Sequence, residues 1–146
     1  MKTKFILLFL LLFSCKSINS ISNSCDRCKC YYDEKLKTDV YITYDTSPKY
    51  REGEMRLYSL VAKNIFIPLN AYRPSTKVIV KIFINEEGII VDLRIADKPE
   101  EKYNILEKEI IRVLFETKNN WISAQCEGKN VVSMLRLPFG FHFQEP

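Results

Sequence analysis

The sequence predicts an α+β domain of two layers, in which two helices pack on an antiparallel sheet of about three strands. Residues 77–96 hold two runs of alternating apolar and polar side chains around a glycine-containing turn, which is typical of a β-hairpin. Two stretches, 53–64 and 100–117, repeat apolar residues at helical spacing. A further alternating run over 131–137 completes the order helix, strand, strand, helix, strand.

The first helix follows a short β-rich run at 40–45, which predicts a lead-in strand. Over 53–64 the apolar residues fall on one stripe, and an acidic first turn and a basic last turn suit the helix dipole. We expect Pro68 to end this helix. The stripe consists of Leu57, Leu60 and Val61, continued by Ile65.

The hairpin is the clearest prediction in the chain, with strands at 77–85 and 89–96 and Gly88 free to adopt a positive φ in the turn. Alternation gives each strand one buried face. The predicted core faces are Val78, Val80, Ile82 and Ile84 in the first strand, and Ile89, Val91, Leu93 and Ile95 in the second. The opposite face of the first strand carries Lys77, Ile79, Lys81 and Phe83.

The second helix is predicted over 100–117 and the last strand over 131–137, where Pro138 should end it. Leu106, Ile110, Val113 and Leu114 form the apolar stripe of the helix, widened by Ile111 and Phe115. The last strand is either the third member of the sheet or an edge that recruits another strand.

Length and composition exclude several classes of function. The chain has 146 residues and a formal charge of +4, which fits one domain and is too weakly basic for a nucleic-acid binder. There is a single histidine, His142, which excludes a histidine-rich metal site. None of the nucleotide-binding, metalloprotease or hydrolase motifs is present. We therefore expect a protein that is not an enzyme and holds no cofactor or metal.

Residues 1–14 have the pattern of a secretory signal peptide, with two lysines followed by a nine-residue apolar run from Phe5 to Phe13. This run is too short to span a bilayer. The end of this run, Leu12-Phe13-Ser14-Cys15, resembles the lipobox of bacterial lipoproteins. That resemblance implies lipidation of Cys15 and cleavage before it, so that acyl chains hold the protein on a membrane. Plain secretion is the alternative. With no aspartate after Cys15, the resemblance favours the outer membrane, facing the periplasm.

Four cysteines remain once Cys15 is set aside: Cys25, Cys28, Cys30 and Cys126. Residues 15–47 form a Ser- and Asn-rich tether followed by this cysteine-rich lead-in, and the domain itself is expected over 48–146. We expect these cysteines to form disulfides, because disulfides persist in an oxidising compartment. One arrangement joins Cys126 to one of the other three and pairs the remaining two. A metal site of four thiolates and a redox-active pair are the alternatives.

Five segments in order resemble the C-terminal domain of TonB, the energy transducer of the bacterial envelope. They are Pro48 to Glu54; Asn64-Ile65 with Pro68 and Ala71; Val78, Val80, Phe83, Gly88 and Ile90; Trp121, Ala124, Gly128, Lys129 and Val131; and Leu137-Pro138 with Phe141. The resemblance spans 48–143 and implies a TonB-like fold. The sequence shows neither an uncleaved membrane helix nor a proline-rich spacer, so we expect no transmission of proton-motive force by this chain alone.

The resemblance also implies a mode of binding, in which the sheet edge adds a strand from a partner such as a TonB-dependent transporter. The residues that it points to are Val131, Ser133 and Arg136 on the last strand. The expected function is a lipid-anchored envelope module that binds a protein and no nucleic acid. The alternatives are a structural or accessory envelope lipoprotein, or a thiol-redox or metal-binding protein, for which Cys126 and His142 would be the only thiol–imidazole pair.

Overall fold

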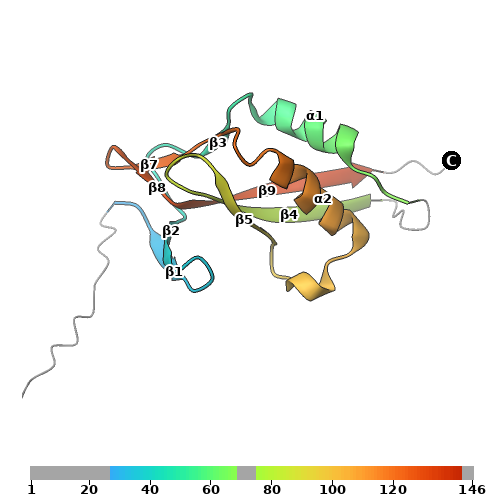
Figure 1. The fold of residues 1–146 in the computed structure, drawn as a ribbon, viewed down its shortest axis with the longest axis horizontal. Helices are drawn as coiled ribbons and strands as arrows, with labels where there is room; N and C mark the ends of the chain where they lie inside the picture. Colours follow the sequence, from blue (N-terminus) through green and yellow to red (C-terminus); the bar gives the residue numbers. More distant parts are fainter. Residues whose placement is uncertain (1–26, 69–74, 143–146) are drawn as a thin grey trace, which may run out of the picture.

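The computed structural model describes residues 27–68 and 75–142 and has two helices on one face of a five-stranded sheet (Figure 1). The predicted α+β class of two layers is therefore confirmed, but the expected number of strands was too low. The strand order is β1 (Cys30–Asp33), β2 (Thr38–Tyr41), β9 (Ser133–His142), β4 (Ser75–Ile84) and β5 (Ile90–Ile95). Neighbours are antiparallel except β2 and β9, which are parallel.

Two small strand pairs lie beside the sheet. The first joins β3 (Lys49–Tyr50) to β6 (Trp121–Ile122), and the second joins β7 (Ala124–Cys126) to β8 (Lys129–Val131). Strands β7 and β8 are joined by a turn in which Glu127 and Gly128 both have positive φ. The leader, Cys15, the tether and Cys25 lie outside the described residues.

Both predicted helices form, with shorter bounds. Helix α1 runs over Glu54–Asn64, and helix α2 over Ile105–Glu116 follows a short 3₁₀ turn η2 at Glu100–Lys102. Helix α2 begins later than predicted because Asn104 caps it: its side chain accepts from the Glu107 N–H at 2.9 Å, and the Glu107 carboxylate accepts from the Asn104 N–H at 2.7 Å. This reciprocal capping box fixes the helix start.

The main core lies between the helices and the sheet. The predicted helix stripes face it, while Phe115 is exposed and does not widen the buried stripe. Trp121 is buried, and its ring meets that of Tyr50 edge-on at 5.5 Å. The buried set includes Leu57, Val61, Val78, Val80, Ile82, Ile84, Leu106, Ile110, Val113 and Leu114.

One face of β5 differs from the prediction. The register between β4 and β5 shifts at Phe83/Ile84, so that Ile84 is opposite Ile90. Because a one-residue shift exchanges the two faces of a strand, Ile90 is buried and Val91 is exposed at this end, the reverse of the expected pattern. Leu93 and Ile95 face the core as predicted.

The second face of the sheet is partly covered by the β1–β2 hairpin. The lead-in strand expected over 40–45 overlaps β2 only at Val40 and Tyr41, and β1 was not predicted. Val40 packs with Phe83 of β4 and with Val132 in a second small cluster, which Leu36 and Met134 border. In Figure 1 this hairpin (blue) lies on the side of the sheet away from both helices. The sheet therefore has one face covered by the helices and one face covered only at the hairpin end.

Candidate partner-binding edge of the sheet

Strand β9 has a neighbour on both sides only at its start. On one side β4 pairs with it along its whole length, from Ser133↔Ile84 to His142↔Ser75. On the other side β2 reaches it at a single pair, Tyr41↔Ser133. Within residues 27–68 and 75–142, no strand is paired with the rest of that side. An unpaired length of strand is a template for another strand.

The direction of the free backbone groups follows from two hydrogen bonds. The Tyr44 hydroxyl donates to the Met134 carbonyl at 3.1 Å, and the Ala96 N–H donates to the Ile79 carbonyl at 2.9 Å. The backbone carbonyl of Met134 therefore points away from β4. Ile79 is opposite Pro138, and the backbone carbonyl of Ile79 points toward β5. Because backbone groups alternate along a strand, Arg136, Pro138, Gly140 and His142 also point away from β4. We call these four backbone positions the open edge.

Pro138 corrects the predicted end of the last strand. The sequence predicted a strand over 131–137 that stops at this proline, whereas β9 continues through it to His142. Proline lacks only an N–H, and at Pro138 that N–H would point to the open edge rather than into the ladder with β4. The strand thus tolerates the proline because its other side is unpaired.

The three residues predicted to bind a partner are separated by the structure. Val131 belongs to β8 and pairs with Ala124 of β7, so it is not part of the last strand. Ser133 is fully buried between β2 and β4, and its hydroxyl oxygen has no hydrogen-bond partner among the described residues. Arg136 is exposed and lies on the open edge.

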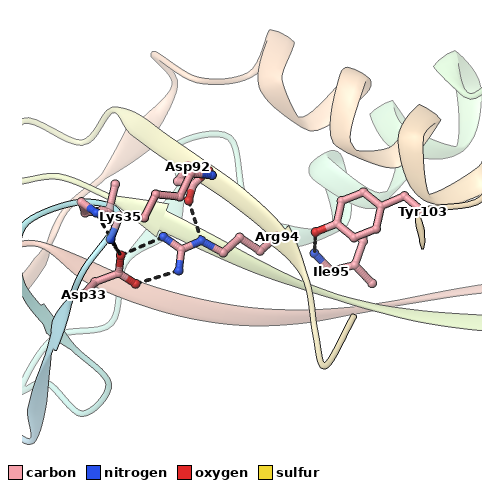
Figure 2. Close-up of polar contacts among 7 residues, drawn as sticks. Asp33, Lys35, Asp92, Arg94, Ile95 and Tyr103 are labelled. Carbon is pink, nitrogen blue, oxygen red and sulfur yellow. Dashed lines mark hydrogen bonds and ion pairs between the residues drawn. The ribbon is translucent and has the colours of Figure 1, made fainter. Parts of the chain in front are cut away.

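The opposite border of the sheet is partly covered. At strand β5 the Ile95 N–H donates to the Tyr103 hydroxyl at 2.9 Å, as Figure 2 shows, and the Ile90 N–H donates to the Lys118 carbonyl at 2.9 Å. Strand β1 forms the other border but is only four residues long. Short or covered border strands are poor templates for strand addition. The open edge of β9 is therefore the longest available template in the described sheet.

A salt-bridge network holds the β1–β2 hairpin against β5 (Figure 2). Arg94 donates to both carboxylate oxygens of Asp33 at 2.7 and 2.9 Å and to Asp92 at 2.5 Å, and Lys35 also contacts Asp92. The guanidinium lies 4.2 Å from the centre of the Phe83 ring. The hydrogen bonds from Arg94 lower the pKa of Asp33 from 3.8 to about 2, and Asp33 in turn raises the pKa of Arg94.

The cysteines form disulfides where the structure describes them. Cys28 is bonded to Cys126, and Cys30 is also disulfide-bonded. The predicted link between Cys126 and one of the other three cysteines is confirmed. The Cys28, Cys126 and Asp45 side chains lie close enough together to suggest a metal site, but the disulfide removes both thiolates that such a site would need.

The remaining sequence candidates play structural parts. Cys126 is bonded to Cys28, so it offers no thiolate to His142, which is exposed at the end of β9. Tyr50 is in the core, whereas Tyr31 and Tyr32 are exposed on β1. Burial raises the pKa of Tyr44, whose hydroxyl is bonded to the Met134 carbonyl.

A hollow of about 430 Å³ opens between the hairpin, β5 and residues 97–103. Three of the cations that line it already have acidic partners: Lys35 with Asp92, Arg94 with Asp33 and Asp92, and Lys98 with Glu107. A fourth lining cation, Lys81, is 3.9 Å from the exposed Asp97 carboxylate. Because most of its charged groups already have close partners, we do not assign the hollow a ligand.

Comparisons with known proteins give one likeness of fold. No family model matches the chain, and no curated protein matches it. The NMR solution structure of the Helicobacter pylori TonB C-terminal domain is similar with a TM-score of 0.44 and 16% sequence identity, over 63% of this chain and 95% of that one. In the part of the chain that the structure describes, neither helix is long and apolar enough to cross a membrane.

Two features of the open edge could not be read from the sequence. Tyr44 limits the edge, because its hydroxyl occupies the Met134 carbonyl, and Gly140 extends the edge as an exposed residue without a side chain. A signal for the open side existed in Pro138 itself, because a proline inside an alternating run marks a strand with one unpaired side.

Proposed function

We propose that the protein is a lipid-anchored module of the bacterial cell envelope that binds a protein partner by adding a strand of that partner to the open edge of β9. The observation that carries this proposal is the unpaired side of β9, whose outward backbone groups at Arg136, Pro138, Gly140 and His142 belong to exposed residues. Main-chain hydrogen bonds along this edge supply affinity, and flanking side chains supply selectivity.

The location in the envelope is supported by the sequence. The signal-peptide pattern and the resemblance of Leu12 to Cys15 to a lipobox support a location outside the cytoplasm, with Cys15 as the proposed lipid attachment site. The disulfide between Cys28 and Cys126 suits an oxidising compartment. The resemblance of residues 48–143 to TonB C-terminal domains makes an outer-membrane transporter of the TonB-dependent class our proposed partner.

The decisive variant is Gly140→Pro. Its ring replaces an N–H that points to the open edge and leaves the ladder with β4 intact, as Pro138 already does. The position has room, since a Cβ at Gly140 would meet no atom within 4 Å. We expect Gly140→Pro to weaken partner binding at least about tenfold, since it removes one main-chain donor and places the ring in the path of the added strand. Cross-linking in intact cells followed by mass spectrometry measures the bound partner.

Gly140→Ala is the matched control, because it adds the Cβ and keeps the N–H. Both variants should keep the melting temperature of the parent within a few degrees, and Cys15→Ser should move the protein out of the membrane fraction. Equal partner recovery from Gly140→Pro and Gly140→Ala would refute strand addition at this edge. It would favour the alternative of an accessory lipoprotein that packs through another surface.

A further inference from the structure

A row of three cations crosses the face of the sheet that the helices do not cover. Arg94 of β5 is directly opposite Lys81 of β4, and Lys81 is directly opposite Arg136 of β9. Like charges in directly opposed positions are unfavourable in a sheet. The backbone groups of Ile79 and Pro138 point away from each other, so these two residues form a non-hydrogen-bonded pair. Lys81 and Arg136 are two residues further along and therefore form a pair of the same kind. In such pairs the side chains are closer together, which increases the repulsion.

The three cations are compensated very unequally. Arg94 is neutralised by Asp33 and Asp92 at hydrogen-bonding distance. Lys81 and Arg136 share a single carboxylate, Asp97, which lies 3.9 Å from each and is 82% exposed. Exposed ion pairs of this length contribute little. Two cations on this face therefore lack an effective counter-charge among the described residues.

A fourth cation, Lys77, extends the positive charge along β4. It is exposed and has no ion pair in the described part of the chain. Gly140 is its direct neighbour on β9, and between Gly140 and Arg136 the cross-strand pair is Ile79 with Pro138. We call Lys77, Lys81 and Arg136 the basic face. It borders the open edge because Arg136 and Gly140 belong to both the edge strand and this face.

The strand register predicts which residues of an added strand would lie beside the basic face. A residue placed opposite Arg136 has its side chain beside that guanidinium, on the same face of the sheet. A residue placed opposite Gly140, four positions away, lies within reach of the Lys77 stem, because Gly140 has no side chain in between. The residue between them lies beside Pro138, and the two alternate residues lie beside Leu137 and Phe139 on the helix side.

Resting on the proposed function, we infer that the partner strand carries two acidic residues four positions apart, separated by three apolar residues. The acidic side chains lie opposite Arg136 and Gly140, where they neutralise the basic face. The central apolar residue lies beside Pro138, and the other two lie over the edge of the main core. The pattern is symmetric, so it holds for a parallel and for an antiparallel partner. The recognised class of ligand is thus an extended acidic peptide.

The test uses the full-length protein in detergent with its disulfides intact and two synthetic peptides. One has the core glutamate-valine-valine-valine-glutamate flanked by threonines, and the other has glutamine in place of both glutamates. We expect the acidic peptide to bind about tenfold more tightly at low ionic strength, and the difference to shrink as salt is added. Arg136→Gln combined with Lys77→Gln should abolish the difference. Lys63→Gln, which changes an exposed lysine on α1, should preserve it.

The outcomes separate the inference from the function on which it rests. If Gly140→Pro removes binding of both peptides but the wild type does not distinguish them, the edge binds strands and the acidic preference is refuted. If neither peptide binds any variant or the wild type, strand addition itself fails. Vesicles of anionic phospholipid are the second probe: if they bind, lose binding in the Arg136→Gln/Lys77→Gln variant and compete with the acidic peptide, the basic face recognises a membrane surface and the inference is overturned.

Discussion

The Asp33 carboxylate shows how a single residue fixes the position of a whole hairpin. It is 5% exposed and accepts hydrogen bonds from Arg94 and from the backbone N–H groups of Lys35 and Leu36. One carboxylate thus forms the turn between β1 and β2 and binds the hairpin to β5. Buried charges are stable only with this degree of pairing, because an unpaired ion in the interior loses its hydration.

We expect the contribution of Asp33 to stability to depend on pH. Its pKa is about 2 in the folded protein against 3.8 for the ordinary carboxyl, so the folded state favours the ionised form. The stabilisation is therefore complete above pH 4 and is lost as the pH falls through 4 toward 2. Asp33→Asn should lower the free energy of unfolding by about 2 kcal/mol at neutral pH. Urea denaturation of both proteins between pH 2 and pH 7 measures the difference.

The difference between the two proteins should shrink toward zero near pH 2. Arg94→Lys provides a control, because it keeps the charge but not the two-point contact with the carboxylate. A loss of stability in Asp33→Asn that is the same at all pH values would show that shape, and not ionisation, accounts for the contribution of Asp33.

At the scale of an element, the turn of the β4–β5 hairpin is positioned by what it touches. Asn85 accepts hydrogen bonds from the N–H groups of Glu87 and Ile89 through its side chain, and Gly88 has a φ of +77°. A Cβ on Gly88 would lie 2.5 Å from the Trp121 carbonyl oxygen. The glycine is therefore required twice, for the backbone conformation and for the close approach of the turn to β6.

Two glycine-to-alanine variants separate these requirements. Gly128 has a similar φ of +74°, but a Cβ there would meet nothing within 4 Å. Gly128→Ala should lower the free energy of unfolding by about 1 kcal/mol, because a positive φ is unfavourable for a residue with a side chain. Gly88→Ala should cost about 3 kcal/mol, because the Trp121 backbone must also move. Denaturant titrations measure both losses of unfolding free energy. Equal losses would show that the Trp121 backbone moves away from the added Cβ without destabilising the protein.

For the whole molecule, the disulfide between Cys28 and Cys126 joins the start of the described chain to strand β7. These residues are separated by 98 positions, and their Cα atoms are 6.2 Å apart. The link fastens the start of the β1–β2 hairpin to β7, close to where β9 begins. A cross-link over so long a loop restricts the unfolded chain strongly. The hairpin is thereby kept on the otherwise uncovered face of the sheet.

Replacing both cysteines by alanine should lower the unfolding free energy by roughly 4.7 kcal/mol, the value expected for a loop of this length. Denaturant unfolding of the double variant and of the oxidised wild type measures this loss, and a peptide map without reductant identifies the bond in the wild type. The Asp33–Arg94 network remains in the variant, so the native fold should persist at neutral pH. A loss below about 1 kcal/mol would show that the hairpin is held by its non-covalent contacts.

The parts of the fold that the sequence predicted are those that depend on local periodicity. The β4 strand, the apolar stripes of α1 and α2 and the turn at Gly88 each follow from spacing within a dozen residues. The predicted start of the second helix was wrong because a continuous charged run obscured the Asn104 cap. The β1–β2 hairpin was predicted only in part, as a lead-in strand over 40–45, because its strands are four residues long, which is too short for a clear alternation.

The candidate site depended on pairing between distant segments. The sequence by itself determined that the last strand alternates, that Arg136 is on its polar face and that cysteines suited to disulfides are present. Only the tertiary structure decided that β9 runs through Pro138, that β2 leaves most of its outer side unpaired, and that Arg136 is opposite Lys81. The physical reason is that periodicity records which face of a strand is buried, whereas register and neighbours are set by contacts between residues far apart in the chain.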